Sequence, residues 1–229
     1  MTYIPYLSTL ITFVFTFAVY NRYRQRGGTH LLLWALGLLF YGIGTLSEVI
    51  LSLSFNAFVL KIWYLTGAML TAAWLGMGTV HLLIRKGKTA QVTTWILAIV
   101  SLLAFLLVLI APTLSSSYNV TVPASEQYKN ILTRNGLTIL LTILLNIYGT
   151  LTLIGGAIYS AFLFWRRKIL ANRVFGNILI ATGALSPALG GTLLKAGYAD
   201  MLYISEFIGA ILMFIGFIVS TSGKPETYG

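Results

Sequence analysis

The chain contains no cysteine and few ionisable residues. Of its 229 residues, 9% are charged; five are acidic, and two more are histidines. The absence of cysteine excludes disulfides, thiolate metal sites, covalent haem attachment and cysteine nucleophiles. A soluble domain carries about 25% charged residues, so this chain has too little polar surface to coat a water-soluble globule.

The chain is instead rich in apolar residues, which make up 58% of the sequence. They form seven runs long enough to cross a bilayer, which takes about 20 apolar residues in a helix. The runs are continuous rather than alternating, which is typical of helices and not of a membrane β-barrel. The sequence therefore predicts one all-α integral membrane domain over residues 1–229, a bundle of seven transmembrane helices. We place the helices at residues 2–21, 31–54, 62–84, 92–111, 136–165, 174–194 and 201–220.

The net charge of +10 arises from fifteen basic residues. In a membrane protein such an excess is mainly a topology signal, so we expect no nucleic-acid partner. Eleven of the fifteen follow the first, third, fifth and seventh predicted helices. Because basic segments stay in the cytoplasm, this bias predicts an N-terminus outside and a C-terminus inside. We expect a multi-pass protein of the bacterial inner membrane, with the lipid bilayer as its first partner.

The segments between and within the helices carry further polar signals. The longest connection, Pro112–Asn135, is rich in serine and threonine and is expected to be a loop on the outer side. Asn146 and Asn177 lie inside predicted helices. We expect both to hydrogen-bond between helices, a contact worth on the order of 1 kcal/mol.

Two short motifs recur along the chain. Gly44–Ser47 in the second helix resembles Gly183–Ser186 in the sixth, and Gly67–Leu70 in the third resembles Gly209–Leu212 in the seventh. A parallel repeat of three helices, one linker helix and three helices (3+1+3) predicts both matches. Chance similarity between apolar helices is the alternative.

Several chemistries are missing from the sequence. The middle of the last helix, Gly209–Gly216, contains no lysine for a retinal Schiff base, and Val80–Arg85 lacks the acid-Arg-Tyr pattern of animal G-protein-coupled receptors. His30 and His81 lie near helix ends, and no two histidines or acids have the i, i+3 or i, i+4 spacing of a chelating pair. We therefore expect no enzymatic activity, no metal and no cofactor.

The second and third helices carry a resemblance to a known family. Trp34 opens a run that includes Glu48 near the outer face, and a short turn leads to Lys61–Tyr64 and then to a glycine-containing helix with Trp74 and a basic inner end. Together with the Gly209–Gly216 run, this plan resembles the seven-helix N-terminal sensor region of some bacterial histidine kinases. No kinase segment follows the last helix in this sequence. The resemblance implies a sensing or binding role rather than catalysis.

Ionisable residues cluster in or near the outer third of the predicted bundle: Glu48, Lys61, Asp200 and Glu206. An acid inside a membrane costs about 2.5–3.5 kcal/mol on insertion scales and indicates a functional site by default; a structural ion pair is the alternative. We expect Glu48, Lys61 and Glu206 to line one outward-opening cavity, with Glu48 and Lys61 paired. Aromatic residues complete the predicted ligand-binding set: Trp63, Tyr64 and Tyr203.

These observations predict a non-enzymatic, receptor-like membrane sensor that signals through a separate cytoplasmic protein. A small-solute or proton-coupled transporter of 3+1+3 design is the first alternative, and Pro187 inside the sixth helix favours it. An accessory subunit of a larger membrane complex is the second alternative. A homo-oligomer is a further expected arrangement.

Overall fold

The structure is a computed structural model that describes residues 3–84, 87–114, 118–166, 171–196 and 200–222. The described residues include seven helical spans long and apolar enough to cross a membrane. This confirms the predicted all-α class and a multi-pass integral membrane protein. The spans are Ile4–Arg26, Thr29–Leu53, Ala57–Leu83, Thr89–Ile110, Gly136–Arg166, Ala171–Leu193 and Met201–Ser222.

Five spans are single helices, and two are interrupted. The single helices are α1 (Ile4–Arg26), α2 (Thr29–Leu53), α5 (Thr89–Ile110), α9 (Ala171–Lys195) and α10 (Asp200–Ser222). The third span consists of α3 (Ala57–Trp63), the π-helical segment η1 (Tyr64–Leu70) and α4 (Thr71–Leu83). The fifth consists of α7 (Gly136–Thr150), the π-helical segment η3 (Leu151–Gly155) and α8 (Gly156–Arg166). π-Helical turns inside α-helices are frequent at functional sites.

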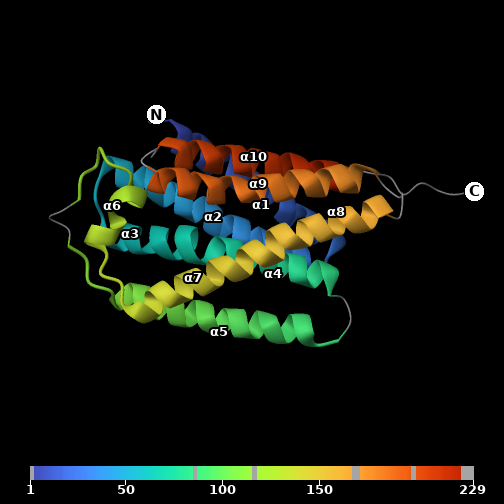
Figure 1. The fold of residues 1–229 in the computed structure, drawn as a ribbon, viewed down its shortest axis with the longest axis horizontal. Helices are drawn as coiled ribbons and strands as arrows, with labels where there is room; N and C mark the ends of the chain where they lie inside the picture. The colour runs from blue at the N-terminus through green and yellow to red at the C-terminus, as the bar shows by residue number, and fades with distance from the viewer. Residues whose placement is uncertain (1–2, 85–86, 115–117, 167–170, 197–199, 223–229) are drawn as a thin grey trace, which may run out of the picture.

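Six helices form a closed ring. Contacts run from α1 to α2, from α2 to α4, from α4 to α8, from α8 to α9, from α9 to α10 and back from α10 to α1. α5 lies outside this ring, against α4 and α7, along one edge of the bundle (Figure 1). α9 packs on α8 and η3 in one half of the bundle, whereas α7 diverges from α9 toward the other end (Figure 1). This divergence leaves space between the two helices.

Glycines allow the closest helix approaches. A Cβ atom added to Gly44 on α2 would lie 3.0 Å from the Cα of Gly67 on η1. One added to Gly183 on α9 would lie 2.7 Å from the carbonyl oxygen of Gly209 on α10. Such small-residue contacts take the place of a hydrophobic driving force between membrane helices.

The connection at 112–135, expected to be a loop, contains a helix. α6 (Ala124–Ile131) begins directly after Pro123, carries Glu126 in its first turn and Lys129 in its last, and therefore has the charge order that a helix favours. An isolated bridge pairs Thr113 with Leu132, and the side chains of Ile131 and Leu132 are buried in the core. α6 thus folds back over one end of the bundle, which we call the α6 end (Figure 1).

The opposite end carries several arginines, and we call it the arginine end. α1 continues to Arg26, five residues beyond the predicted limit at Asn21. Arg24 and Arg26 lie in its last turn, where cationic side chains stabilise a helix C-terminus. The helix ends at Gly27, whose φ of 67° favours glycine. The predicted limit at Asn21 is wrong because the long side chains of basic residues let a helix continue into the interface.

Candidate functional site

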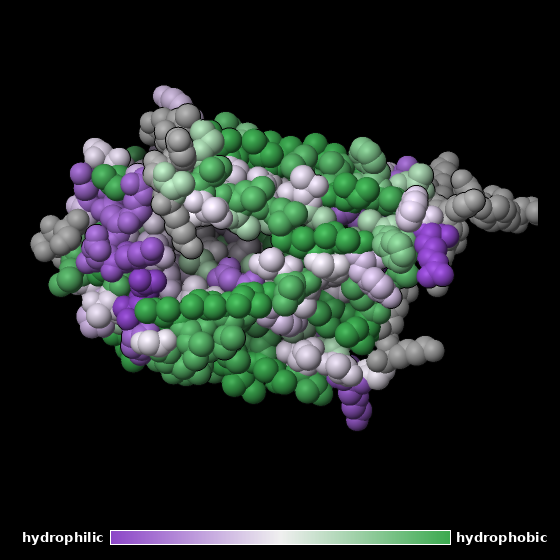
Figure 2. Space-filling view, viewed as in Figure 1, coloured by the Kyte–Doolittle hydropathy of each residue, from purple (hydrophilic) through white to green (hydrophobic). Residues whose placement is uncertain are grey.

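A cavity of about 590 Å³ lies in the half of the bundle nearest to the α6 end. Its walls come from α2, α3, η1, α4, α6, α7, η3, α9 and α10. Figure 2 shows a hollow between the surfaces formed by α9 and α7, with hydrophilic atoms at its base. The cavity therefore opens on the side of the bundle, where α7 diverges from α9. The structure thus has a cavity beside Glu48 and Glu206, with a lateral mouth rather than the expected opening at the end of the bundle.

Glu48 lies in one wall, five residues before the end of α2 at Leu53. Its residue exposure is 6%. Oε1 accepts a hydrogen bond of 2.8 Å from the indole Nε1 of Trp63. Oε2 is also buried and has no hydrogen-bond partner among the described residues. Most buried polar atoms have partners, so this oxygen is an unused acceptor buried in the cavity wall.

Glu206 lies in the wall formed by α10. Its backbone oxygen accepts a hydrogen bond of 2.8 Å from the hydroxyl of Tyr41, which fixes α10 to α2. The carboxyl groups of Glu206 and Glu48 are close enough to interact electrostatically. Two acids from two different helices therefore face one cavity, as the sequence predicted.

Aromatic and amide groups line the rest of the cavity. The rings of Trp63 and Tyr128 meet edge to face, with centroids 5.4 Å apart. Asn146 donates from Nδ2 to the backbone oxygen of Ala68 at 2.7 Å, which links α7 to η1. The predicted interhelical role of Asn146 is confirmed, and Asn177 likewise donates from Nδ2 to Ser160 Oγ at 3.2 Å.

Lys61 does not pair with Glu48, so this part of the prediction is wrong. Its Nζ donates a hydrogen bond of 2.7 Å to the backbone oxygen of Leu109, near the end of α5. The last four carbonyl groups of a helix lack partners within that helix, and the ammonium group supplies one. Lys61 therefore caps the C-terminal end of α5, and Glu48 has no basic partner in the described part of the chain.

The other predicted site residues take different places. Tyr64 is 1% exposed, and its hydroxyl shares a hydrogen bond of 2.8 Å with Thr142 Oγ1 behind the wall. Tyr203 is close enough to Glu48 and Glu206 to interact with their charges, but it is not a wall residue of the cavity. The side chain of Asp200 lies outside the described residues. Of the predicted set, the structure brings together Glu48, Trp63 and Glu206.

Sequence reasoning missed the contribution of α6. Four residues of a segment expected to be a loop lie along the cavity: Ser125, Glu126, Tyr128 and Lys129. Ser125 Oγ is buried beside the hydroxyl of Tyr203. The available signal was Pro123 followed by helix-forming residues with an acid first and a base later.

Tyr118 lies at the rim of this region, outside the spans. Its hydroxyl donates a hydrogen bond of 2.9 Å to the backbone oxygen of Leu51 at the end of α2. Burial, and secondly the charge of Glu48, raise the pKa of Tyr118 to about 12. The phenol therefore stays protonated and keeps donating at neutral pH.

The arrangement is suited to holding a cation by contacts other than metal coordination. Within the described ranges, no group of three histidine, cysteine or acidic residues is placed to hold a metal ion. The cavity instead combines two carboxyl groups with the aromatic side chains of Trp63 and Tyr128, and the guanidinium of Arg134 already lies over the Tyr128 ring, 4.9 Å from its centroid. Carboxylates and aromatic faces both attract organic cations. Comparison with protein-family models, with curated proteins and with solved structures finds no match to this chain.

Proposed function

We propose that the protein is a non-enzymatic, receptor-like membrane sensor whose lateral cavity binds a small organic cation. The observation that carries the proposal is Glu48 Oε2, a buried carboxylate oxygen without a partner beside a 590 Å³ cavity. A buried polar atom left unpaired costs about 1–3 kcal/mol. A bound cation would place a positive charge beside this oxygen and offset part of this cost.

The rest of the cavity favours the same ligand class. Glu206 adds a second acid opposite Glu48, and Trp63 and Tyr128 offer aromatic surface. Lys129, the basic wall residue, is an exposed residue of α6 at the mouth. A mouth between α7 and α9 lies at the depth of the membrane, so the ligand would have an apolar body and one positive charge.

We also propose the finer points of topology. The bias of basic residues supports an arrangement in which the α6 end faces outward and the arginine end faces the cytoplasm of a bacterium. The signal would then pass along α10, which Tyr41 ties to α2 through the backbone of Glu206. The resemblance to histidine-kinase sensor regions supports an output to a separate cytoplasmic protein.

Transport is the second candidate, and helix interruptions favour it. Pro187 lies inside α9 and lines the cavity, and the π-helical segments η1 and η3 interrupt two other spans beside it. Interrupted helices near the membrane middle are typical of transporter binding sites. The glycine contacts at Gly44–Gly67 and Gly183–Gly209 involve the two motifs of the proposed 3+1+3 repeat, which supports the same candidate.

A pair of probes of equal shape and opposite charge tests the binding site. The detergent-purified protein is titrated with tetraphenylphosphonium and with tetraphenylborate, and the fluorescence of the tryptophans is recorded. We expect saturable binding of the cation only, weakened at least tenfold by Glu48→Gln. The control Glu226→Gln removes an equal charge from the tail after α10 and should bind normally. Equal binding of both probes, or equal loss in both variants, would contradict the proposal.

Sensing and transport are separated by two further measurements. A fluorescent label on Ser222→Cys, at the end of α10, should change its emission when tetraphenylphosphonium binds. Proteoliposomes containing the protein should not accumulate the cation above the level in vesicles without protein. If the cation binds without changing the emission at position 222, and proteoliposomes take it up specifically, the protein is a transporter and not a sensor.

A further inference from the structure

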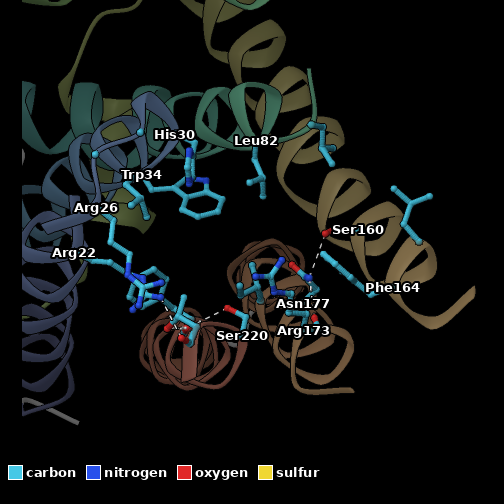
Figure 3. Close-up of a pocket in the computed structure, with 18 residues that line it drawn as sticks. Arg22, Arg26, His30, Trp34, Leu82, Ser160, Phe164, Arg173, Asn177 and Ser220 are labelled. Atoms are coloured by element: carbon cyan, nitrogen blue, oxygen red, sulfur yellow. Dashed lines mark hydrogen bonds between the residues drawn. The ribbon is translucent and has the colours of Figure 1, made fainter. Parts of the chain in front are cut away.

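A second cavity, of about 660 Å³, lies at the arginine end of the bundle. The residues around it come from α1, α2, α4, α8, α9 and α10, the six helices of the closed ring (Figure 3). It is separate from the cavity of Glu48. On α10, Met213 lines the first cavity and Phe217, one turn further, lines the second.

Three arginines face this cavity. Arg22 and Arg26 reach it from α1, and Arg173 reaches it from α9 on another side (Figure 3). Arg22 experiences the positive charges of both Arg26 and Arg173, so the three guanidinium groups repel one another. Arg22 Nη2 donates to the backbone oxygen of Thr221 at 3.1 Å, and its guanidinium carbon lies 6.0 Å from the ring centroid of Phe217. The guanidinium carbon of Arg173 lies 5.2 Å from the ring centroid of Phe164.

No acidic residue lies among the described residues that line this cavity. Glu48, Glu126, Asp200 and Glu206 belong to the half of the bundle near the α6 end. Glu226 lies outside the described residues. Among the described residues of the cavity wall, the three positive charges therefore have no negative counterpart.

Helix α2 adds to the positive potential. It begins at Thr29, directly beside Gly27 and Gly28 of the cavity wall. Its first turn contains no acid, and no side chain caps its N-terminus. The N-terminus of a helix carries a partial positive charge and favours anions. The guanidinium groups and the N-terminus of α2 thus face the same cavity.

We infer that this cavity binds the phosphate group of a small organic anion, held by Arg22, Arg26 and Arg173. Arginine presents a planar fork of donors that matches phosphate oxygens, and a phosphate carries enough negative charge to offset the mutual repulsion of several guanidinium groups. Trp34 and the neighbouring leucines offer apolar surface for the rest of the molecule. This site is independent of the function proposed for the first cavity.

The phosphate could belong to a dissolved molecule or to a lipid. Six helices line the cavity at the end of the bundle, which favours a dissolved phosphate ester that enters from that end. Anionic lipid headgroups also bind to basic pockets on the cytoplasmic side of membrane proteins. The experiment therefore needs one arm for each source.

In the first arm, the full-length protein in phosphatidylcholine nanodiscs is titrated with pyrophosphate by isothermal calorimetry. In the second arm, the protein is extracted from vesicles containing phosphatidylglycerol, and retained lipid is measured by native mass spectrometry. The variants are Arg173→Gln and Arg22→Gln. The control is Arg24→Gln, on the same helix as Arg22 but exposed and outside the cavity wall.

We expect saturable pyrophosphate binding that both variants weaken at least tenfold and that Arg24→Gln changes less than twofold. If phosphatidylglycerol is retained instead, and both variants but not the control reduce its retention, the phosphate site is supported and its ligand is a lipid. Arg22→Gln loses the bond to the Thr221 backbone oxygen, so the thermal midpoint of each variant is measured to check that it folds. If Arg22→Gln does not fold, Arg173→Gln alone tests the inference. The inference is overturned if neither phosphate source binds, or if the control loses as much binding as Arg173→Gln.

Discussion

The indole Nε1 of Trp63 and the carboxylate Oε1 of Glu48 are joined by a hydrogen bond of 2.8 Å between the third span and α2. This bond uses one oxygen of Glu48 and leaves Oε2 buried without a partner among the described residues. The same contact therefore stabilises the crossing of two helices and orients an acid beside the cavity. The first prediction tests its strength.

Replacing Trp63 by phenylalanine removes the donor and leaves both oxygens of Glu48 unpaired. We expect a loss of about 1–3 kcal/mol in the free energy of unfolding, because a buried acceptor loses its partner. Trp74→Phe is the matched control, since Trp74 Nε1 donates only to the neutral Ser101 Oγ at 3.1 Å. Unfolding in detergent micelles measures both losses. A larger loss for Trp74→Phe would contradict a special contribution of the Trp63–Glu48 bond to stability.

Lys61 and Glu48 are expected to act independently. Lys61→Gln removes the ammonium bond to the Leu109 carbonyl and should cost about 0.3–1 kcal/mol, the typical value of a cation at a helix C-terminus. Combined with Glu48→Gln, the two losses should add within about 0.5 kcal/mol. A double-mutant cycle measures this coupling. A coupling energy above that limit would indicate that Lys61 and Glu48 do pair, as the sequence suggested.

The contact between Gly183 and Gly209 leaves no room for a larger residue. Gly183→Ala would place a Cβ atom 2.7 Å from the Gly209 oxygen, and we expect a loss of about 1–3 kcal/mol through overpacking. Gly191→Ala, also in α9, has no neighbour within 4 Å of the added atom. This control should be neutral or slightly stabilising, because alanine favours helices more than glycine does. Equal thermal midpoints for the two variants would exclude a tight crossing.

Alkaline pH should weaken the end of α2 through Tyr118. Its pKa of about 12 in the folded state lies above the ordinary tyrosine value of about 10. The folded protein therefore holds this proton more tightly than the unfolded chain does. The stability that the folded protein gains from this protonated phenol is complete below pH 10 and is lost as the pH rises from 10 to 12. Spectrophotometric titration of the protein and of Tyr118→Phe should differ by one phenol that ionises near pH 12; a difference near pH 10 would contradict the burial.

The orientation can be measured directly, because the chain has no cysteine of its own. Val120→Cys lies in the segment before α6, and Gln91→Cys lies in the first turn of α5 at the other end. Both residues are exposed. A membrane-impermeant thiol reagent applied to intact cells should label position 120 and not position 91. The reverse pattern would invert the proposed topology.

The seven spans could be predicted from the sequence because the cost of placing a residue in hydrocarbon is local and adds up along the chain. The helix limits were less accurate where charged side chains reach the interface, as at Arg26 of α1. The meeting of Glu48 and Glu206 was also predictable, since both acids lie a few residues from helix ends at one side of the membrane. A costly buried acid points toward neighbouring helices rather than toward lipid.

Only the tertiary structure decided which neighbours these acids have. Lys61 binds the Leu109 carbonyl because α5 ends beside it, and no local pattern in the sequence contains that position. The lateral mouth follows from the divergence of α7 and α9, and α6 becomes a wall because it folds back over the bundle. Hydropathy determines whether a segment enters the membrane. The direction in which each helix leans depends on close contacts such as Gly183–Gly209, which join residues that are distant in the chain.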